Sequence, residues 1–163
     1  MDQTKDDNAT AVKLRPLAKS LPMSLLRARE ALMAEFRPML HEHKLTEQQW
    51  RVLRVLMEND EITVTALARE AVILPPSLSR ILRGLVSKGL VKRRAQRADQ
   101  RRAQVMIAAK GQRLFDSVAP HSSEIYDELE KRLGKRRLKE LTDLLLEVEN
   151  DLLDGAAGRA TSP

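Results

Sequence analysis

Hydrophobic residues recur at helical spacing near both ends of the chain. From Leu21 to about His43 they fall three or four positions apart, and the segment from Lys135 to about Leu153 repeats the pattern. Pro38 interrupts the first pattern, and we expect it to kink or end that helix. The second segment is strongly amphipathic, with Leu138, Leu141, Leu145, Val148 and Leu152 on one face. The two patterns predict a helix with a long apolar face near each terminus.

The middle of the chain predicts shorter elements. Thr46 followed by Gln49 is a capping box, which places the start of a second helix at Thr46. A short extended piece is expected at residues 62–63, followed by a third short helix that carries Leu67 and Ala68.

The fourth predicted helix begins at the pair Pro75-Pro76 and ends at Gly89. Its apolar stripe predicts a buried face, and its polar and basic residues are left facing outward. Two short strands are expected at 90–94 and 103–108, joined by a basic loop, and a long helix should follow from Lys110 to about Arg132. The predicted buried stripe is Leu78, Ile81, Leu82 and Leu85.

This order of elements predicts a mainly α fold with a small β-wing, that is, a winged helix-turn-helix with six helices. We expect residues 45–111 to form the DNA-binding lobe and residues 21–44 and 112–153 to form dimerisation helices from both termini. Three short central helices cannot cover both terminal apolar stripes, so a second copy of the chain is the expected partner. Residues 1–20 and 154–163 are expected to be a flexible arm and a flexible tail.

Positive charge is concentrated in this winged lobe. Between Pro76 and Arg102 there are nine Lys and Arg residues and one acid, Asp99, for a net charge of +8. The whole chain is +6, so the remaining residues, 20 basic against 22 acidic, sum to −2. Such a local excess of positive charge is typical of a surface that binds nucleic acid. The alternative is that these basic residues form an ordinary solvent-exposed surface with no binding role.

Composition excludes several other classes. The chain has no cysteine, which rules out a disulfide framework or a thiolate metal site, and no apolar run long enough to span a membrane. We expect a soluble, cytoplasmic protein that needs no cofactor. The acidic pairs near 127–130 and 147–149 have no histidine partner or glycine-rich loop nearby, so an enzyme is not expected.

The segment GLVKRRAQRADQRRAQVMIAAKG resembles the wing of the MarR family of transcriptional regulators. It carries the Asp-x-Arg signature as Asp99-Gln100-Arg101, and Lys110-Gly111 follows it. The segments KLTEQQWRVLRVL, PPSLSRILRGLVSKGLVKR and SLLRAREALMAEFRPML resemble a narrower branch, the repressors of homoprotocatechuate and related aromatic-acid degradation operons. One departure is Ala108, where the family often has a Thr or Ser that caps the next helix.

The resemblance implies a homodimer that presents two winged helices to a palindromic DNA operator. The fourth helix fits the major groove, and the wing loop reaches the backbone and the minor groove. Asp99 can accept hydrogen bonds from loop donors and so hold the loop in shape. The predicted DNA-binding residues are Pro76, Ser77, Ser79, Arg80, Arg83, Arg97, Asp99, Arg101 and Arg102.

The resemblance also implies a small-molecule effector, an aromatic carboxylate or its coenzyme A thioester. Candidate effector-binding residues are Ser24, Arg27, His41 and Trp50. A guanidinium binds a carboxylate bidentately, but Arg27 also fits a surface or dimer salt bridge, and Trp50 also fits a core anchor.

There are three further alternatives, one for a local site and two for the whole protein. The run His41-Glu42-His43 invites a metal site, but His121 is the only other histidine, so we expect a solvated helix end and no metal. For the whole protein, the leading function is a ligand-responsive repressor. The alternatives are an effector-independent architectural DNA-binding protein and a winged-helix module for protein assembly.

Overall fold

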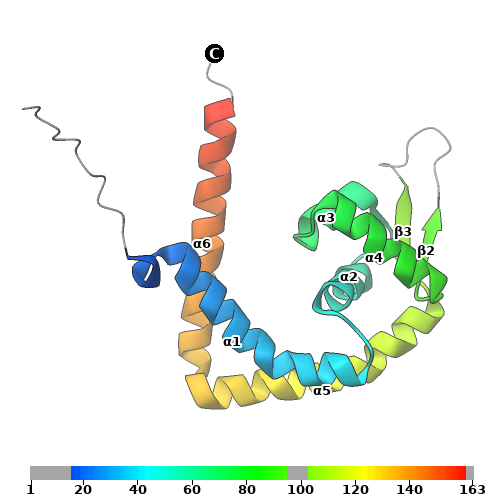
Figure 1. The fold of residues 1–163 in the computed structure, drawn as a ribbon, viewed down its shortest axis with the longest axis horizontal. Helices are drawn as coiled ribbons and strands as arrows, with labels where there is room; N and C mark the ends of the chain where they lie inside the picture. The colour runs from blue at the N-terminus through cyan, green and yellow to red at the C-terminus, as the bar shows by residue number, and fades with distance from the viewer. Residues whose placement is uncertain (1–15, 95–102, 161–163) are drawn as a thin grey trace, which may run out of the picture. The chain divides into compact units, whose positions relative to one another are not determined.

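The computed structural model describes residues 16–94 and 103–160, with side chains described as far as residue 154 (Figure 1). Within these ranges it has the six expected α-helices, a three-stranded sheet and one short 3-10 helix, η1 (Leu17–Lys19), which the sequence pattern did not predict. The contacts divide the chain into two units, residues 1–35 and 36–163.

The first helix, α1 (Leu21–Glu42), begins where the hydrophobic pattern predicts and passes through Pro38. The helix does not end at Pro38, and the kink that was the other expected effect stays a prediction. Proline removes one backbone donor, but Phe36, Met39 and Leu40 around it are buried, and this burial holds the last turns in place. The chain then turns at Lys44, whose φ of 55° is left-handed, into the next helix.

The second helix, α2 (Glu47–Glu58), opens with the predicted capping box. The Gln49 amide donates to the Thr46 hydroxyl oxygen at 3.1 Å, and the Thr46 amide donates to the Gln49 side chain at 3.1 Å. Two short elements follow, β1 (Ile62–Thr63) and α3 (Val64–Glu70), where the Thr63 hydroxyl accepts from the Ala66 amide at 3.2 Å. These caps satisfy amides that lack partners inside a helix.

The wing pairs with β1 to make an antiparallel sheet in the order β1-β3-β2. Strand β2 (Val91–Arg94) pairs along its full length with β3 (Gln104–Ile107), from Val91 opposite Ile107 to Arg94 opposite Gln104. Before β2, helix α4 (Pro75–Ser87) ends as expected, because Gly89 adopts a φ of 70° that favours glycine. Leu53, Leu67, Leu78, Leu85 and Val105 are completely buried among these elements and form the core of the lobe.

Helix α5 (Ala109–Leu133) joins the lobe to the last helix and continues through Pro120. Its N-cap, Ala108, makes no side-chain cap bond, as its residue type predicts. Three ring pairs connect α5 to the segment that runs from the end of α1 into α2, in antiparallel order: Phe36 with Tyr126, His43 with His121, and Trp50 with Phe115. The four aromatic residues of the chain thus fix this register.

The last helix, α6 (Lys135–Ala160), runs beyond the expected end near Leu153. None of its described side chains is buried. Among residues 16–94 and 103–160, no helix is long and apolar enough to cross a membrane.

Candidate nucleic-acid interface

Helix α4 divides into a buried face and a polar face, as predicted. Leu78, Ile81, Leu82 and Leu85 are all buried. Arg80 and Arg83 are exposed on the opposite side, and neither makes a hydrogen bond or ion pair with another described residue. An exposed helix with two uncommitted guanidinium groups is suited to the major groove, where arginine reads guanine through two parallel hydrogen bonds.

The first turn of α4 also carries the other predicted contacts. Pro76 and Ser79 are exposed and Ser77 is half-buried. The Ser79 hydroxyl donates to the Pro75 carbonyl at 3.0 Å. Its proton is therefore used within the helix, and toward DNA Ser79 offers acceptor lone pairs. Pro75 and Pro76 carry no N–H, and the Leu78 amide donates to the Leu74 carbonyl at 2.9 Å, so in this first turn the Ser77 amide is the donor that could meet a phosphate.

The turn between α3 and α4 is held by a residue that the sequence analysis missed. One Arg51 nitrogen, Nη1, donates to the carbonyls of Ala71 at 2.9 Å and Val72 at 3.2 Å. Val72 has a φ of 50°, which is strained for a β-branched residue, and its side chain is three-quarters exposed. Arg51 thus joins α2 to the turn that leads into α4. No sequence signal identifies this role, because the contacts join residues twenty positions apart.

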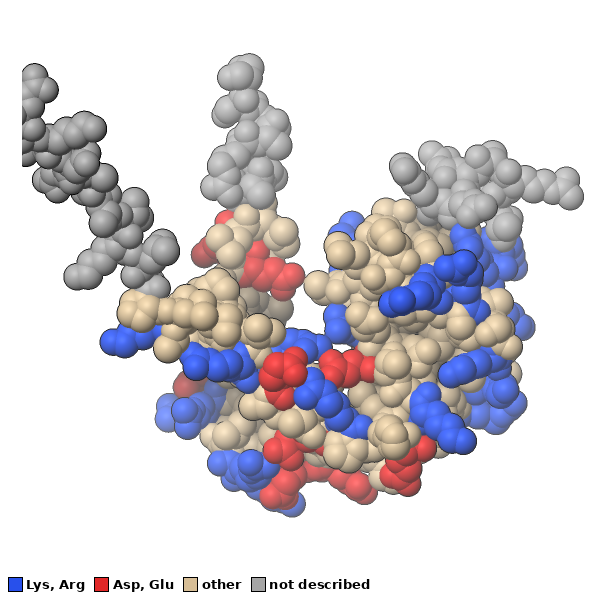
Figure 2. Space-filling view, in the orientation of Figure 1, with Lys and Arg blue, Asp and Glu red and all other residues tan. Residues whose placement is uncertain are grey.

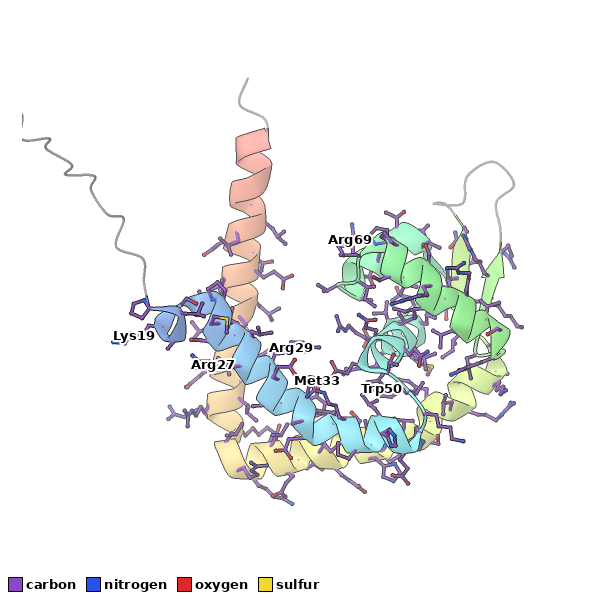
Figure 3. All side chains as sticks on the ribbon, in the orientation of Figure 1. Lys19, Arg27, Arg29, Met33, Trp50 and Arg69 are labelled. Carbon is purple, nitrogen blue, oxygen red and sulfur yellow. The ribbon has the colours of Figure 1, made fainter. Side chains whose placement is uncertain are left out.

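A groove of about 1110 Å³ adjoins this polar face. It lies between α3, the following turn and the start of α4, with Arg69, Ser79 and Arg93 among its lining residues. Arg69, labelled in Figure 3, projects from α3. Exposed apolar side chains at Val72 and Leu74 also line this groove. The surface beside α4 therefore combines apolar contact area with two arginines.

Strand β2 continues the positive surface. Lys92, Arg93 and Arg94 are all exposed. Arg94 forms an ion pair with Glu61, with 3.5 Å between Nη1 and Oε1. Figure 2 shows Lys and Arg side chains gathered on the visible face of the winged-helix lobe. The remaining predicted DNA-binding residues, Arg97, Asp99, Arg101 and Arg102, lie outside the described residues, so their roles stay predictions.

The four candidate effector residues are divided between the two units. In the first unit Ser24 and Arg27 are exposed on α1, and Arg27 Nη2 donates to the Ala18 carbonyl at 2.7 Å (Figure 3). In the second unit His41 is exposed, whereas Trp50 is buried and stacks on Phe115 with ring centres 5.0 Å apart and planes at 21°. Trp50 thus serves the core, and the effector site itself stays a prediction.

A basic recognition helix, its supporting helices and a β-wing define a winged helix-turn-helix DNA-binding protein. Comparison with known proteins identifies the family. Residues 43–102 match the model of the MarR family. The chain is also 41% identical, over 79% of its length and 88% of the relative, to the HTH-type transcriptional regulator FarR of Neisseria gonorrhoeae. The chain belongs to the MarR family, which confirms the family and fold predicted from sequence.

Further similarities agree. The homoprotocatechuate degradative operon repressor of Escherichia coli is 40% identical over 78% of this chain and 86% of the relative. Among solved structures, NadR in complex with 4-hydroxyphenylacetate is 40% identical with a TM-score of 0.71, over 83% of this chain and 96% of that chain. Ligand-free NadR gives a TM-score of 0.74 at 39% identity, over 83% and 98%. The predicted likeness to the homoprotocatechuate repressor branch is thereby confirmed.

Proposed function

We propose that this protein is a transcriptional repressor that binds a palindromic operator as a homodimer and is released by an aromatic acid or its coenzyme A thioester. The observation that carries the DNA-binding part is the exposed face of α4, where Arg80 and Arg83 have no described partner. The basic strand β2 extends that surface. Together they offer base-reading and phosphate-neutralising groups on one lobe.

The homodimer is supported by apolar surface that the described chain leaves uncovered. On α6, Leu144, Leu146, Leu152 and Leu153 are all more than half exposed, and Leu141 and Leu145 are 47% and 41% exposed. On α1, Leu21 and Leu26 are 58% and 48% exposed. Because burying a leucine contributes roughly 1.5–3 kcal/mol, leaving this many in water is costly. We assign dimerisation to residues 21–44 and 112–153 and the DNA lobe to residues 45–111.

The effector class is supported by the relatives. One similar protein is a homoprotocatechuate degradative operon repressor and another was solved with 4-hydroxyphenylacetate. Both names point to hydroxylated aromatic acids. We therefore propose that this chain acts by binding, not by catalysis, and that it works in the cytoplasm, where the operator is found.

The test is release of the protein from DNA of its own upstream region. Full-length protein is titrated into this duplex and into shuffled duplex, with and without 4-hydroxyphenylacetate and related thioesters. We expect the native duplex to be bound at least ~10³-fold more tightly than the shuffled one. One aromatic acid should release the protein from the native duplex and so remove this preference. Equal affinity for both duplexes, unaffected by every acid, would establish the architectural alternative instead.

A further inference from the structure

The chain has three histidines, and the fold brings two of them together. His43 lies just after α1, and His121 lies in the middle of α5, far away in sequence. Their ring centres are 5.6 Å apart and their planes are inclined by 44°. His41, two positions earlier, is exposed and takes no part in this pair. The fold thus places His121 beside His43, although no sequence pattern indicated that these two histidines would be neighbours.

The bonding of His43 is incomplete. Its Nε2 atom is shielded from solvent and has no hydrogen-bond partner among the described residues. A buried polar atom without a hydrogen-bond partner destabilises the fold. A neutral imidazole nitrogen is also one of the commonest ligands for transition metals. An ion at this position would therefore satisfy the unpaired nitrogen.

Neighbouring contacts hold the pair in place. On one side Phe36 packs edge-on against Tyr126 with ring centres 5.1 Å apart, and on the other Trp50 stacks on Phe115 at 5.0 Å. These contacts fix the register between α5 and the segment that holds His43. The core around the two imidazoles holds them 5.6 Å apart, so their separation does not depend on a loop.

We propose that His43 and His121 together bind a divalent transition-metal ion such as Cu²⁺, Ni²⁺ or Zn²⁺. Two imidazoles on one tetrahedral ion, each bonded at about 2.1 Å, have ring centres about 5–6 Å apart, and the observed separation is 5.6 Å. Across the described ranges, no group of three His, Cys, Asp or Glu residues forms a metal site. Water completes the coordination shell from the exposed side, where His121 lies, and with two protein ligands the affinity is modest.

This site is independent of the DNA-binding proposal. His121 is exposed, so the ion enters from solvent and is then held against the shielded Nε2 of His43. A bound ion joins the end of α1 to α5 and stabilises the unit that contains both. Among these three ions, nitrogen ligands bind Cu²⁺ most tightly, and Ni²⁺ and Zn²⁺ more weakly. Binding weakens in acid, since only neutral imidazole ligates.

The test is calorimetric titration of untagged, full-length protein with Cu²⁺, Ni²⁺ and Zn²⁺. Wild type is compared with His43→Gln, His121→Gln and the matched control His41→Gln. We expect one ion per chain in wild type and in His41→Gln, with at least ~10-fold weaker binding in the other two variants. The Cu²⁺ electron paramagnetic resonance spectrum should show two coordinated nitrogens in wild type and at most one in either pair variant.

Three results would overturn the proposal: no binding of any of the ions to wild type, unchanged binding in His121→Gln, or an equal loss in His41→Gln. Circular dichroism checks that each variant is folded. If His43→Gln does not fold, His121→Gln decides the question, because His121 is exposed and its replacement leaves the core intact.

Discussion

Gly111 lies directly against the backbone of Leu90. A β-carbon at position 111 would stand 2.1 Å from the Leu90 carbonyl oxygen, a separation that no real side chain tolerates. That same oxygen accepts a hydrogen bond from the Ala108 amide at 2.9 Å. The start of α5 is therefore joined to the residue just before β2. The close approach also explains why glycine, and no larger residue, follows Lys110.

Gly111→Ala should destabilise the protein by roughly 1–3 kcal/mol or more, because either α5 or Leu90 must move. The matched control is Gly84→Ala, where an added β-carbon meets nothing within 4 Å. Gly84 lies inside α4, so alanine there should stabilise by about 0.5–1 kcal/mol. Urea unfolding of the three proteins measures both changes, and equal effects of the two substitutions would contradict the steric explanation.

Arg80→Ala should relax the preference for one base pair in each half-site. The guanidinium is exposed on the recognition helix, and a bidentate contact to guanine contributes about 1–3 kcal/mol of discrimination. Half-site centres should lie about 10 bp apart. Binding to a set of single-base operator variants tests this, with Arg136→Ala on α6 as the control. A uniform loss across all variants would make Arg80 a phosphate contact.

In the wing loop, we expect Arg101→Ala to weaken binding to every DNA sequence. If Arg101 neutralises one phosphate, the slope of log K against log salt should fall by about 0.9. Asp99→Ala should weaken binding as well, although it removes a negative charge, because Asp99 is expected to hold the loop in shape. Tighter binding by Asp99→Ala over a salt series would show that Asp99 acts only through its charge.

The elements of the lobe could be predicted from sequence because local rules set them. The capping box at Thr46, the proline pair at the start of α4 and Gly89 at its end each act within a few residues. By contrast, the pairing of His43 with His121 depends on how α5 packs, and no local pattern encodes it. Whether the helix would continue past Pro38 depended on packing as well, since the neighbours of Pro38 are buried and the helix runs on to Glu42.

The double substitution Leu141→Glu and Leu145→Glu should dissociate the dimer. Both side chains are about half exposed on α6 in the single chain, so the changes cost little there but place two charges in the proposed interface. Sedimentation velocity should show a shift from dimer to monomer, while Glu147→Gln on the same helix should remain dimeric. A double variant that sediments as wild type would remove α6 from the interface.

The effector prediction concerns Arg27, whose Nη2 donates to the Ala18 carbonyl and whose other N–H groups have no hydrogen-bond partner among the described residues. If the guanidinium binds the carboxylate of an aromatic acid, Arg27→Ala should weaken binding of 4-hydroxyphenylacetate by roughly 10–100-fold, since a hydrogen bond to a charged group contributes about 1.5–3 kcal/mol. Calorimetric titration into wild type, Arg27→Ala and the control Arg136→Ala measures this loss.

The acid and the operator should also weaken each other's binding. An acid that lowers operator affinity ~100-fold must bind the DNA-free protein more tightly than the protein–operator complex by about 2.7 kcal/mol. Its affinity for the complex should therefore be lower by the same factor. Equal affinity of the acid for wild type and Arg27→Ala would exclude Arg27 from the effector site.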